Sequence, residues 1–245
     1  RGMDFGTGKV KSDRRQATSD QAFYSDNIRH HLIDVVSPKK DFSAARYVKL
    51  AQKAITDISG RGKLPIICGG TGFYIDALLG IASLPDVPPN KKLRKRFDKL
   101  TAQHLFKMLR KLDPRRAKNI DRHNKRRLVR ALEIVLTTGK PVPLNVLSNK
   151  TSGEQLTEPI VLVKPYTLTP KPYDTFWIGI NPPKERLAKR IEKRLDDRLR
   201  DGMVAEVKKL HDQGVSWKRL ENFGLEYRWI ARYLKTLPKL SAKEG

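Results

Sequence analysis

The sequence has little cysteine and no long apolar run, and each shortage excludes a class of protein. Cys68 is the single cysteine, so no disulfide can form within the chain, which is typical of proteins in a reducing cytosol. No apolar segment reaches transmembrane length, and no stretch resembles a signal peptide. We therefore expect a cytoplasmic protein that does not enter a membrane. Its 245 residues, of which 38% are hydrophobic, suffice for one large domain or two small ones.

Acidic residues are also scarce in relation to basic ones. The chain has 51 Lys and Arg against 26 Asp and Glu, which gives a formal net charge of +25. A surplus of this size indicates a polyanionic partner, above all nucleic acid; the alternative is a basic proteome or a generic ribosome-associated protein. The charge is concentrated in residues 91–130, where 17 Lys or Arg face three acids, a surplus of 14. These 40 residues are therefore a candidate binding surface.

Apolar periodicity and proline-rich stretches divide the sequence into an α/β core and a helical insertion. Apolar residues at helical spacing predict helices at 43–59, 124–138, 183–201 and 203–212. Short β-prone runs predict strands at 31–36, 64–68, 159–163 and 176–180. Strands that alternate with helices favour a parallel sheet with crossover helices. We predict a core at 1–84 and 173–245 and a basic helical insertion at 85–172.

A glycine-rich turn follows the strand predicted at 64–68. Gly69, Gly70, Thr71 and Gly72 lead directly into a helix-like segment. Such a junction directs backbone N–H groups and the positive end of a helix dipole at one point, which suits a phosphate. Glycine lets an anion approach the backbone, and Thr71 adds a hydroxyl. The alternative is an ordinary tight turn between a strand and a helix, which also favours glycine.

Two other patterns do not qualify as sites. The segment 2–9 resembles the P-loop G-x-x-x-x-G-K-[ST], but Met3 stands where the first glycine belongs and Val10 where a hydroxyl would reach magnesium. His30 and His31 are adjacent on a β-prone run, so their side chains point to opposite faces. No further His or Cys lies at ligand spacing. We therefore predict neither a P-loop at 2–9 nor a histidine metal site.

Arginines repeat at four-residue spacing on two of the predicted helices. Arg126 and Arg130 share one face, with Arg127 beside them, and such side chains can hold a phosphate backbone or a base edge. Arg190 and Arg194 share a face of the helix that follows the strand at 176–180. In open α/β sheets ligands collect at the edge from which such helices depart, so Arg194 could neutralise a diphosphate. For both helices the alternative is a solvated charged face.

Taken in order, these residues resemble the tRNA dimethylallyltransferase family, also called tRNA isopentenyltransferase. The matches are collinear over nearly the whole chain, and ten in register are a specific signal. They are Arg1–Lys9, His30–Asp34, Phe42–Ala45, Pro65–Gly72, Asp113–Pro114, Arg127–Glu133, Thr138–Lys140, Arg190–Arg194, Gly202 with Glu206 and Val207, and Gly224–Arg228.

The resemblance implies a P-loop-kinase-like parallel-sheet core with an inserted basic helical domain. The family's reaction moves a dimethylallyl group from dimethylallyl diphosphate to N6 of the adenine just 3′ of the anticodon, with Mg²⁺ assisting. Diphosphate is released, and the target base must leave its stack to be reached. The expected partners are dimethylallyl diphosphate and the anticodon loop of tRNA, and we expect a monomer.

The resemblance also implies roles for individual residues. It makes Thr71 and Arg194 catalytic and places Gly69 and Gly70 with them around the diphosphate. It implies tRNA contact by eight residues, namely Arg94, Arg126, Arg127, Arg130, Phe223, Gly224, Tyr227 and Arg228.

Some family features are absent from this sequence. In the family, the P-loop and an Asp that acts as general base precede the Arg1-Gly-Met-Asp motif, and C-terminal helices continue past the segment near Gly245. We therefore expect this chain to bind tRNA and to transfer little or no prenyl group. A smaller departure is Leu225-Glu226-Tyr227, where a Gly-Tyr pair is usual.

Two alternatives come from other functional classes. The first is a non-catalytic RNA-binding module derived from the same fold, and reading the DNA upstream of Arg1 would distinguish it. The second is a nucleotide or small-molecule kinase, which would bind ATP and consume it without RNA. A kinase leaves the charge of residues 91–130 unexplained.

Overall fold

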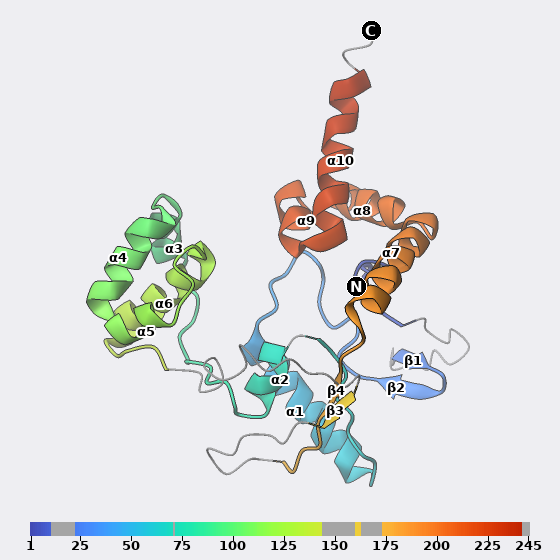
Figure 1. Ribbon diagram of the computed structural model, residues 1–245, viewed down its shortest axis with the longest axis horizontal. Helices are drawn as coiled ribbons and strands as arrows, with labels where there is room; N and C mark the ends of the chain where they lie inside the picture. The colour runs from blue at the N-terminus through green and yellow to red at the C-terminus, as the bar shows by residue number, and fades with distance from the viewer. Residues whose placement is uncertain (11–22, 71, 144–159, 163–172, 242–245) are drawn as a thin grey trace. The chain divides into compact units, whose positions relative to one another are not determined.

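The structure is a computed structural model that describes residues 1–10, 23–70, 72–143, 160–162 and 173–241 (Figure 1). Internal contacts divide the chain into two units, and each is described by itself. The first unit comprises Arg1–Ile66, Gln155–Pro165 and Thr175–Gly245, and the second comprises Ile67–Glu154 and Tyr166–Asp174. The glycine turn falls in the second unit, whereas the predicted division at 84 and 173 assigns it to the core; that division stays a prediction.

The elements of the first unit are strands and helices from both ends of the chain. None of the helices in the described residues is both long and apolar enough to cross a membrane. The bounds are β1 (Phe23–Ser25), β2 (Ile28–His30), α1 (Ala44–Gly60), β3 (Ile160–Leu162), β4 (Ile178–Ile180), α7 (Lys184–Arg200), α8 (Met203–Asp212), α9 (Trp217–Phe223) and α10 (Leu225–Ser241).

The predicted helices of this unit are confirmed to within a few residues. Ser43 caps α1, because its Oγ accepts the N–H of Arg46 at 3.2 Å. Pro183 stands at the N-terminus of α7, where its missing N–H costs no helical bond. The helix predicted at 203–212 is α8. Helical spacing of apolar residues was thus a sufficient signal for all three.

The predicted parallel sheet is wrong for the described residues, whose strands form two antiparallel pairs. β1 pairs with β2, and β3 pairs with β4 in the register Ile160 to Ile180. Residues 31–36 and 64–68 are not strands. Leu64 and Ile66 have the composition of a buried strand but are 82% and 83% exposed. A strand requires a hydrogen-bonded neighbour, and no described strand pairs with this apolar run.

An N-terminal loop packs against a helical core in the first unit. Met203, Val207 and Leu220 are fully buried in the core that α8, α9 and α10 form. Glu206 accepts the N–H groups of Asp4 and Phe5 at 2.7 and 3.1 Å, which ties the loop to α8. Gly6 lies directly against the ring of Tyr227, and a Cβ there would collide with it. The Gly6 position therefore requires glycine for close packing.

The second unit is a small helix bundle preceded by the glycine turn. Leu105, Leu109, Leu128 and Leu132 are fully buried at its centre. Gly139 ends the last helix in a left-handed conformation with φ of 67°. The bounds are α2 (Gly72–Leu78), α3 (Lys91–Asp98), α4 (Ala102–Leu112), α5 (Pro114–Lys118) and α6 (Lys125–Thr138). The helix predicted at 124–138 is confirmed as α6, and α3, α4 and α5 agree with the helical character expected for this basic region.

Candidate functional site

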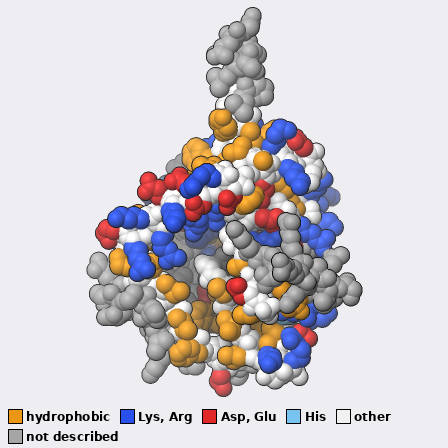
Figure 2. All heavy atoms as spheres, turned by 90° about the vertical axis from the view of Figure 1, so that its right-hand side faces the viewer, with side chains coloured by type: hydrophobic (Ala, Val, Ile, Leu, Met, Phe, Trp, Pro, Cys, Tyr) orange, Lys and Arg blue, Asp and Glu red, His pale blue; other side chains and the backbone are white. Residues whose placement is uncertain are grey.

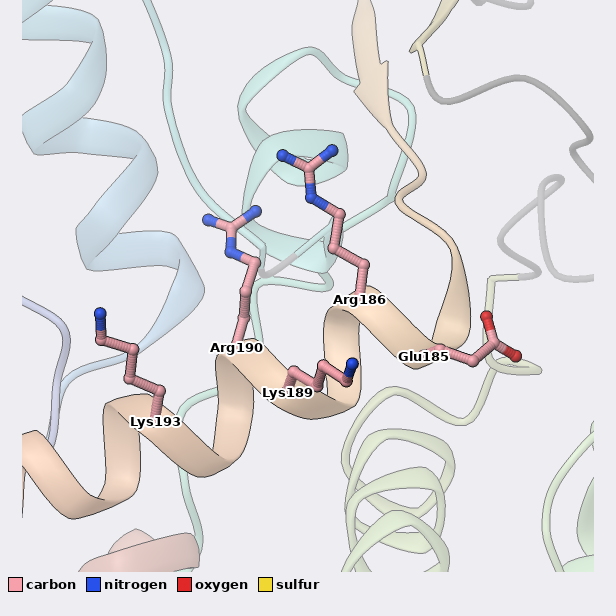
Figure 3. Close-up of a pocket in the computed structure, with 5 residues that line it drawn as sticks. All are labelled: Glu185, Arg186, Lys189, Arg190 and Lys193. Atoms are coloured by element: carbon pink, nitrogen blue, oxygen red, sulfur yellow. The ribbon is translucent and has the colours of Figure 1, made fainter.

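One face of α7 carries cations beside a hollow. The hollow has a volume of about 400 Å³, and Glu185, Arg186, Lys189, Arg190 and Lys193 line it. The spacing of Arg186, Arg190 and Lys193 puts them on one helix face, and Figure 3 shows these three side chains extending to the same side. Glu185 points away from them. The hollow is therefore a region of positive potential.

The four cations that line the hollow have no acidic partner within the described residues. Arg198, farther along α7, behaves differently, because it forms an ion pair with Glu226 of α10 at 2.6 Å. Both of those side chains are largely buried. α7 is thus anchored near its C-terminal end by Arg198, while the cations nearer its N-terminus remain available to an anion. Figure 2 shows Lys and Arg side chains in several groups on one face, with apolar side chains between them.

Arg194, the predicted diphosphate ligand, is exposed on α7. It follows Lys193 in the chain but does not line the hollow. Arg190, which the sequence paired with Arg194, does line it. Both arginines therefore lie on α7, but of the two only Arg190 lines the hollow. Arg194 as a catalytic residue stays a prediction.

The glycine turn is exposed in the second unit. Gly69 and Gly70 lie on the surface, α2 begins at Gly72, and Thr71 lies outside the described residues. A Cβ built at Gly69 or Gly70 would meet no atom within 4 Å, and neither has positive φ. Neither packing nor backbone conformation therefore explains these two glycines in the structure. Their roles at a diphosphate, like that of Thr71, stay predictions.

Two of the predicted RNA-binding arginines converge on a buried carboxylate. Arg94 contacts Glu133 through Nε and Nη2 at 2.9 and 2.8 Å, and Arg130 contacts it through Nη1 at 2.7 Å. Glu133 is fully buried, and its Oε1 also accepts the N–H of Asn90 at 2.6 Å. Burial alone would raise the pKa of Glu133, but the hydrogen bonds from Arg94, Arg130 and Asn90 outweigh it and lower the pKa to about 2.

This network holds the bundle together. Arg130 also donates to the carbonyl of Val87 at 2.9 Å, so it joins α6 to the segment that enters the bundle. Arg94 and Arg130 keep only part of their side chains at the surface, 41% and 36%. The prediction that both contact tRNA stays open, but the structure gives each a packing role that sequence spacing did not reveal.

Arg126 and Arg127 face outward instead. Both are exposed in the first turn of α6, and neither forms an ion pair with a described residue. Asn124 caps the helix by accepting the N–H of Arg127 at 3.2 Å. The predicted shared face of Arg126 and Arg130 is thus divided, because Arg130 turns toward Glu133 while Arg126 and Arg127 remain open to a partner.

The tRNA contact of Tyr227 stays a prediction, and the structure gives this side chain a packing role. Tyr227 is 3% exposed, and its hydroxyl donates to Glu206 at 2.6 Å. Burial, followed by this hydrogen bond, raises the pKa of Tyr227. An apolar ring with one hydroxyl fits the core of the first unit well, and Gly6 packs against its face. Tyr227 is therefore a structural residue that positions the N-terminal loop.

The other residues of the segment 223–228 are placed differently. Phe223 is half-buried and lies edge-on to Tyr227 with ring centroids 5.9 Å apart. Gly224 joins α9 to α10 with φ of 82°, a conformation that favours glycine. Arg228 is exposed and donates through Nε to the carbonyl of Glu221 at 3.1 Å. Of the four predicted RNA contacts here, Arg228 is the one best exposed for that role.

Sequence reasoning missed three residues that organise the first unit: Arg198, Glu206 and Glu226. Glu226 accounts for the departure at Leu225-Glu226-Tyr227, because its carboxylate partners Arg198. Glu206 binds both the N-terminal loop and Tyr227. The sequence did contain one signal for the two glutamates. An acidic residue within a basic helix indicates a specific partner, either a cation or a backbone N–H group.

Comparison with known proteins places the chain in a family. The model of the IPP transferase family matches residues 1–244. The chain is 35% identical to tRNA dimethylallyltransferase of Thermomicrobium roseum over 238 residues, and 34% identical to tRNA dimethylallyltransferase 2 of Pelobacter propionicus over 235. Each match covers 96% of this chain, which spans only 63% and 64% of those relatives.

A solved structure supports the fold. A eukaryotic dimethylallyltransferase, whose crystal structures show it acting on tRNA, has a TM-score of 0.54 and 22% identity, with 89% of this chain and 55% of that chain covered. The fold is therefore of the α/β type, although the described residues are rich in helix and contain few strands. The family match over residues 1–244 shows that the chain belongs to the IPP transferase family.

Proposed function

We propose that the protein transfers a dimethylallyl group from dimethylallyl diphosphate to N6 of the adenine 3′-adjacent to the anticodon of a tRNA. The observation that carries this proposal is the hollow on α7, where Arg186, Lys189, Arg190 and Lys193 have no acidic partner in the described residues. A diphosphate carries the charge and the oxygen acceptors that such a group of cations binds. The relatives' names give the transferred group, dimethylallyl, and the acceptor molecule, tRNA.

The proposed reaction exchanges one bond at the first carbon of the prenyl chain. The bond from this carbon to the diphosphate oxygen breaks, its electron pair leaves with diphosphate, and a new bond forms to N6 of adenine. The amine then loses one proton to a base. An exocyclic amine is a weak nucleophile, so the barrier falls mainly through stabilisation of the leaving diphosphate. Fixed cations such as Arg190, and Arg194 on the same helix, supply that stabilisation.

Recognition of tRNA is proposed for the basic bundle of the second unit. Arg126 and Arg127 are exposed on it without acidic partners among the described residues, and their guanidinium groups suit phosphate oxygens. The anticodon loop is the proposed target, because its bases can be unstacked and reached. We further propose a monomer in the cytoplasm with a P-loop-kinase-like core. The open backbone at Gly69 and Gly70 supports an approach of phosphate to that core.

Magnesium stays a proposal that comes from the family resemblance. The part of the chain that the structure describes contains no group of three or more His, Cys, Asp or Glu side chains that could hold a metal ion. Magnesium with diphosphate substrates commonly uses one or two carboxylates together with substrate oxygens and water. We identify no carboxylate for this role among the described residues and assign no step to the ion.

The test is a transfer assay on the 245-residue chain with tRNA and dimethylallyl diphosphate. Prenylated adenosine, detected by mass spectrometry of digested tRNA, would support the proposal, and its loss in a tRNA that carries guanine at the target position would support the site. Binding of tRNA with little or no transfer is the outcome expected from the sequence, and reading the DNA upstream of Arg1 would then distinguish the RNA-binding module. Consumption of ATP without RNA would favour the kinase.

A further inference from the structure

Helix α10 buries one face in the core of the first unit and leaves an apolar stripe exposed on another. The buried residues of this helix are Tyr227, Ile230 and Ala231. Leu225, Trp229 and Tyr233 recur every four residues and are 77%, 64% and 55% exposed. The C-terminal part of α10 extends beyond α8 and α9 (Figure 1). The stripe is therefore a candidate contact surface.

A row of cations runs beside this stripe. Arg228, Arg232 and Lys235 lie three and four residues apart on α10. Arg228 donates through Nε to the carbonyl of Glu221 at 3.1 Å. The carboxylate of Glu221 contacts Arg232 Nε at 3.3 Å and Lys235 Nζ at 3.0 Å. One acid of α9 thus orients three cations, and the side chains of Arg232 and Lys235 stay 51% and 46% exposed.

The stripe and the row of cations meet at Trp229. The guanidinium group of Arg232 lies over its ring, 5.1 Å from the ring centroid. Because Arg232 also pairs with Glu221, this cation is held beside the ring. An exposed aromatic ring next to a cation suits an unpaired nucleotide, whose base stacks on the ring while its phosphate binds the cation.

The charge around the stripe favours RNA over a second copy of this chain. The two acids closest to the stripe in the sequence, Glu221 and Glu226, already have cation partners, and that of Glu226 is Arg198. A second copy, with a net charge of +25, would bring the same positive charge to this face. Like charges oppose such an association. Unpaired RNA supplies flat rings and negative charge together.

We propose that Trp229 and Tyr233 form a stacking platform for unpaired nucleotides of tRNA, with the neighbouring cations of α10 binding the flanking phosphates. The proposal rests on the proposed tRNA-modifying function. The two residues are about 6 Å apart along the helix axis, more than the roughly 3.4 Å between stacked bases. Each ring therefore takes one base of an unstacked strand. Stacking accepts any base, so the platform adds affinity for single strands without sequence preference.

The experiment measures the affinity of the 245-residue chain for a short single-stranded RNA and for an RNA duplex of the same length, at several salt concentrations. Trp229→Ala should weaken single-strand binding about 5- to 150-fold, the loss expected for one stacked base, and leave duplex binding nearly unchanged. Its slope of log affinity against log salt should stay the same, because no charge is removed. Arg228→Ala should lower that slope by about one.

Further variants separate stacking from folding. Trp229→Phe keeps a ring and should recover most of the affinity, whereas Tyr233→Ala should show a loss of the same kind as Trp229→Ala. Phe176→Ala is the matched control, because Phe176 is an aromatic residue outside α10 and is 77% exposed. It should bind both RNAs as the unaltered chain does. RNA should also quench part of the tryptophan emission, and Trp229→Phe should lose this quenching although it still binds.

Unaltered single-strand binding by Trp229→Ala, or an equal loss for the duplex, would overturn the platform. So would a change from dimer to monomer in Trp229→Ala with RNA binding intact, which would assign the stripe to a second copy. In each case the proposed function stands if the unaltered chain binds tRNA. Failure of the unaltered chain to bind tRNA would overturn both.

Discussion

Helices α6 and α7 are both amphipathic and basic, but their environments differ. α6 buries seven residues and is capped at both ends, by Asn124 and Gly139. α7 buries none of its residues, and its apolar positions, such as Ile191, remain 40–47% exposed. The same periodic pattern therefore yields a core helix in one unit and a largely exposed helix in the other.

The difference also separates two uses of arginine. On α6, the buried carboxylate of Glu133 forms ion pairs with both Arg130 and Arg94. The charge of Arg130 therefore stabilises the fold. On α7, Arg198 alone is committed to an ion pair with a buried partner, Glu226, and the cations around the hollow remain free in the described residues. On α6, basic residues thus include both Arg130, which stabilises the fold, and exposed arginines that are available to a partner. On α7, the cations around the hollow are available to an anion.

The largest effect should come from the packing of α6. Leu132→Ala removes a fully buried side chain and should lower the free energy of unfolding by about 2–5 kcal/mol. Ile191→Ala on α7 should cost under about 1 kcal/mol, because that side chain is 47% exposed. Urea denaturation followed by circular dichroism measures both values. Equal losses would show that α7 is packed as tightly as α6 and would erase the comparison.

The next effect concerns the buried carboxylate. Glu133→Gln removes the charge between Arg94 and Arg130 and should destabilise the bundle by about 1–3 kcal/mol. The pKa of Glu133 is about 2 in the folded protein and ordinarily near 4.5. Because the folded pKa is depressed, the ionised carboxylate contributes stability above pH about 4.5, and this contribution is lost as the pH falls toward 2.

Urea denaturation measured at several pH values between 7 and 2 tests whether the contribution of Glu133 to stability is lost as the pH falls. The unaltered chain should lose stability below pH 4.5 more steeply than Glu133→Gln, which has no proton to gain at that position. Glu192→Gln on α7 is a suitable control, since Glu192 is exposed and forms no ion pair with a described residue. Parallel curves for the unaltered chain and Glu133→Gln would contradict a depressed pKa.

A smaller effect is expected for a substitution in the α7 hollow, and it concerns the affinity for an anion and not the stability of the fold. Arg190→Ala should reduce the affinity for inorganic diphosphate about tenfold, because one charged hydrogen-bonding partner is lost. Stability should change little, since Arg190 has no ion pair to break in the described residues. Arg200→Ala is the control on the same helix, because Arg200 lies outside the hollow and pairs with Asp197 at 2.8 Å. Calorimetric titration of the two variants should separate them; similar losses would indicate only a general charge effect.

The sequence predicted the helices well and the strands poorly, for a physical reason. A helix satisfies its own backbone hydrogen bonds, so the apolar spacing and the cap at Ser43 or Asn124 locate it from local information. A strand depends on a neighbour, and the apolar run at Leu64 and Ile66 did not contain the information on whether one is present. The strands predicted at 159–163 and 176–180 are confirmed as β3 and β4, which pair with each other.

For the candidate site, too, local features of the sequence could be predicted and contacts between distant residues could not. The basic faces of α6 and α7 could be read from spacing, but the partner of each arginine could not. Glu133 pairs with Arg94, which is 39 residues away in the sequence, and Glu226 pairs with Arg198, which is 28 residues away. Burial of Tyr227 against Gly6 is likewise a contact between distant segments. Spacing on one helix thus predicts which arginines share a face but not which of them are already paired.

The smallest expected effect tests this last distinction on α6 itself. Arg126→Ala should reduce the salt dependence of tRNA binding by about one phosphate and leave unfolding unchanged, because Arg126 is exposed and unpaired among described residues. Arg130→Ala should lower the salt dependence as well if its exposed part reaches RNA, but it must also destabilise the bundle, since it leaves Glu133 and the Val87 carbonyl short of a donor. Filter binding and thermal unfolding, measured on the same two variants, separate the roles. A loss of stability in Arg126→Ala equal to that in Arg130→Ala would mean that the outward face of α6 is structural too, and that its charge is no evidence for RNA.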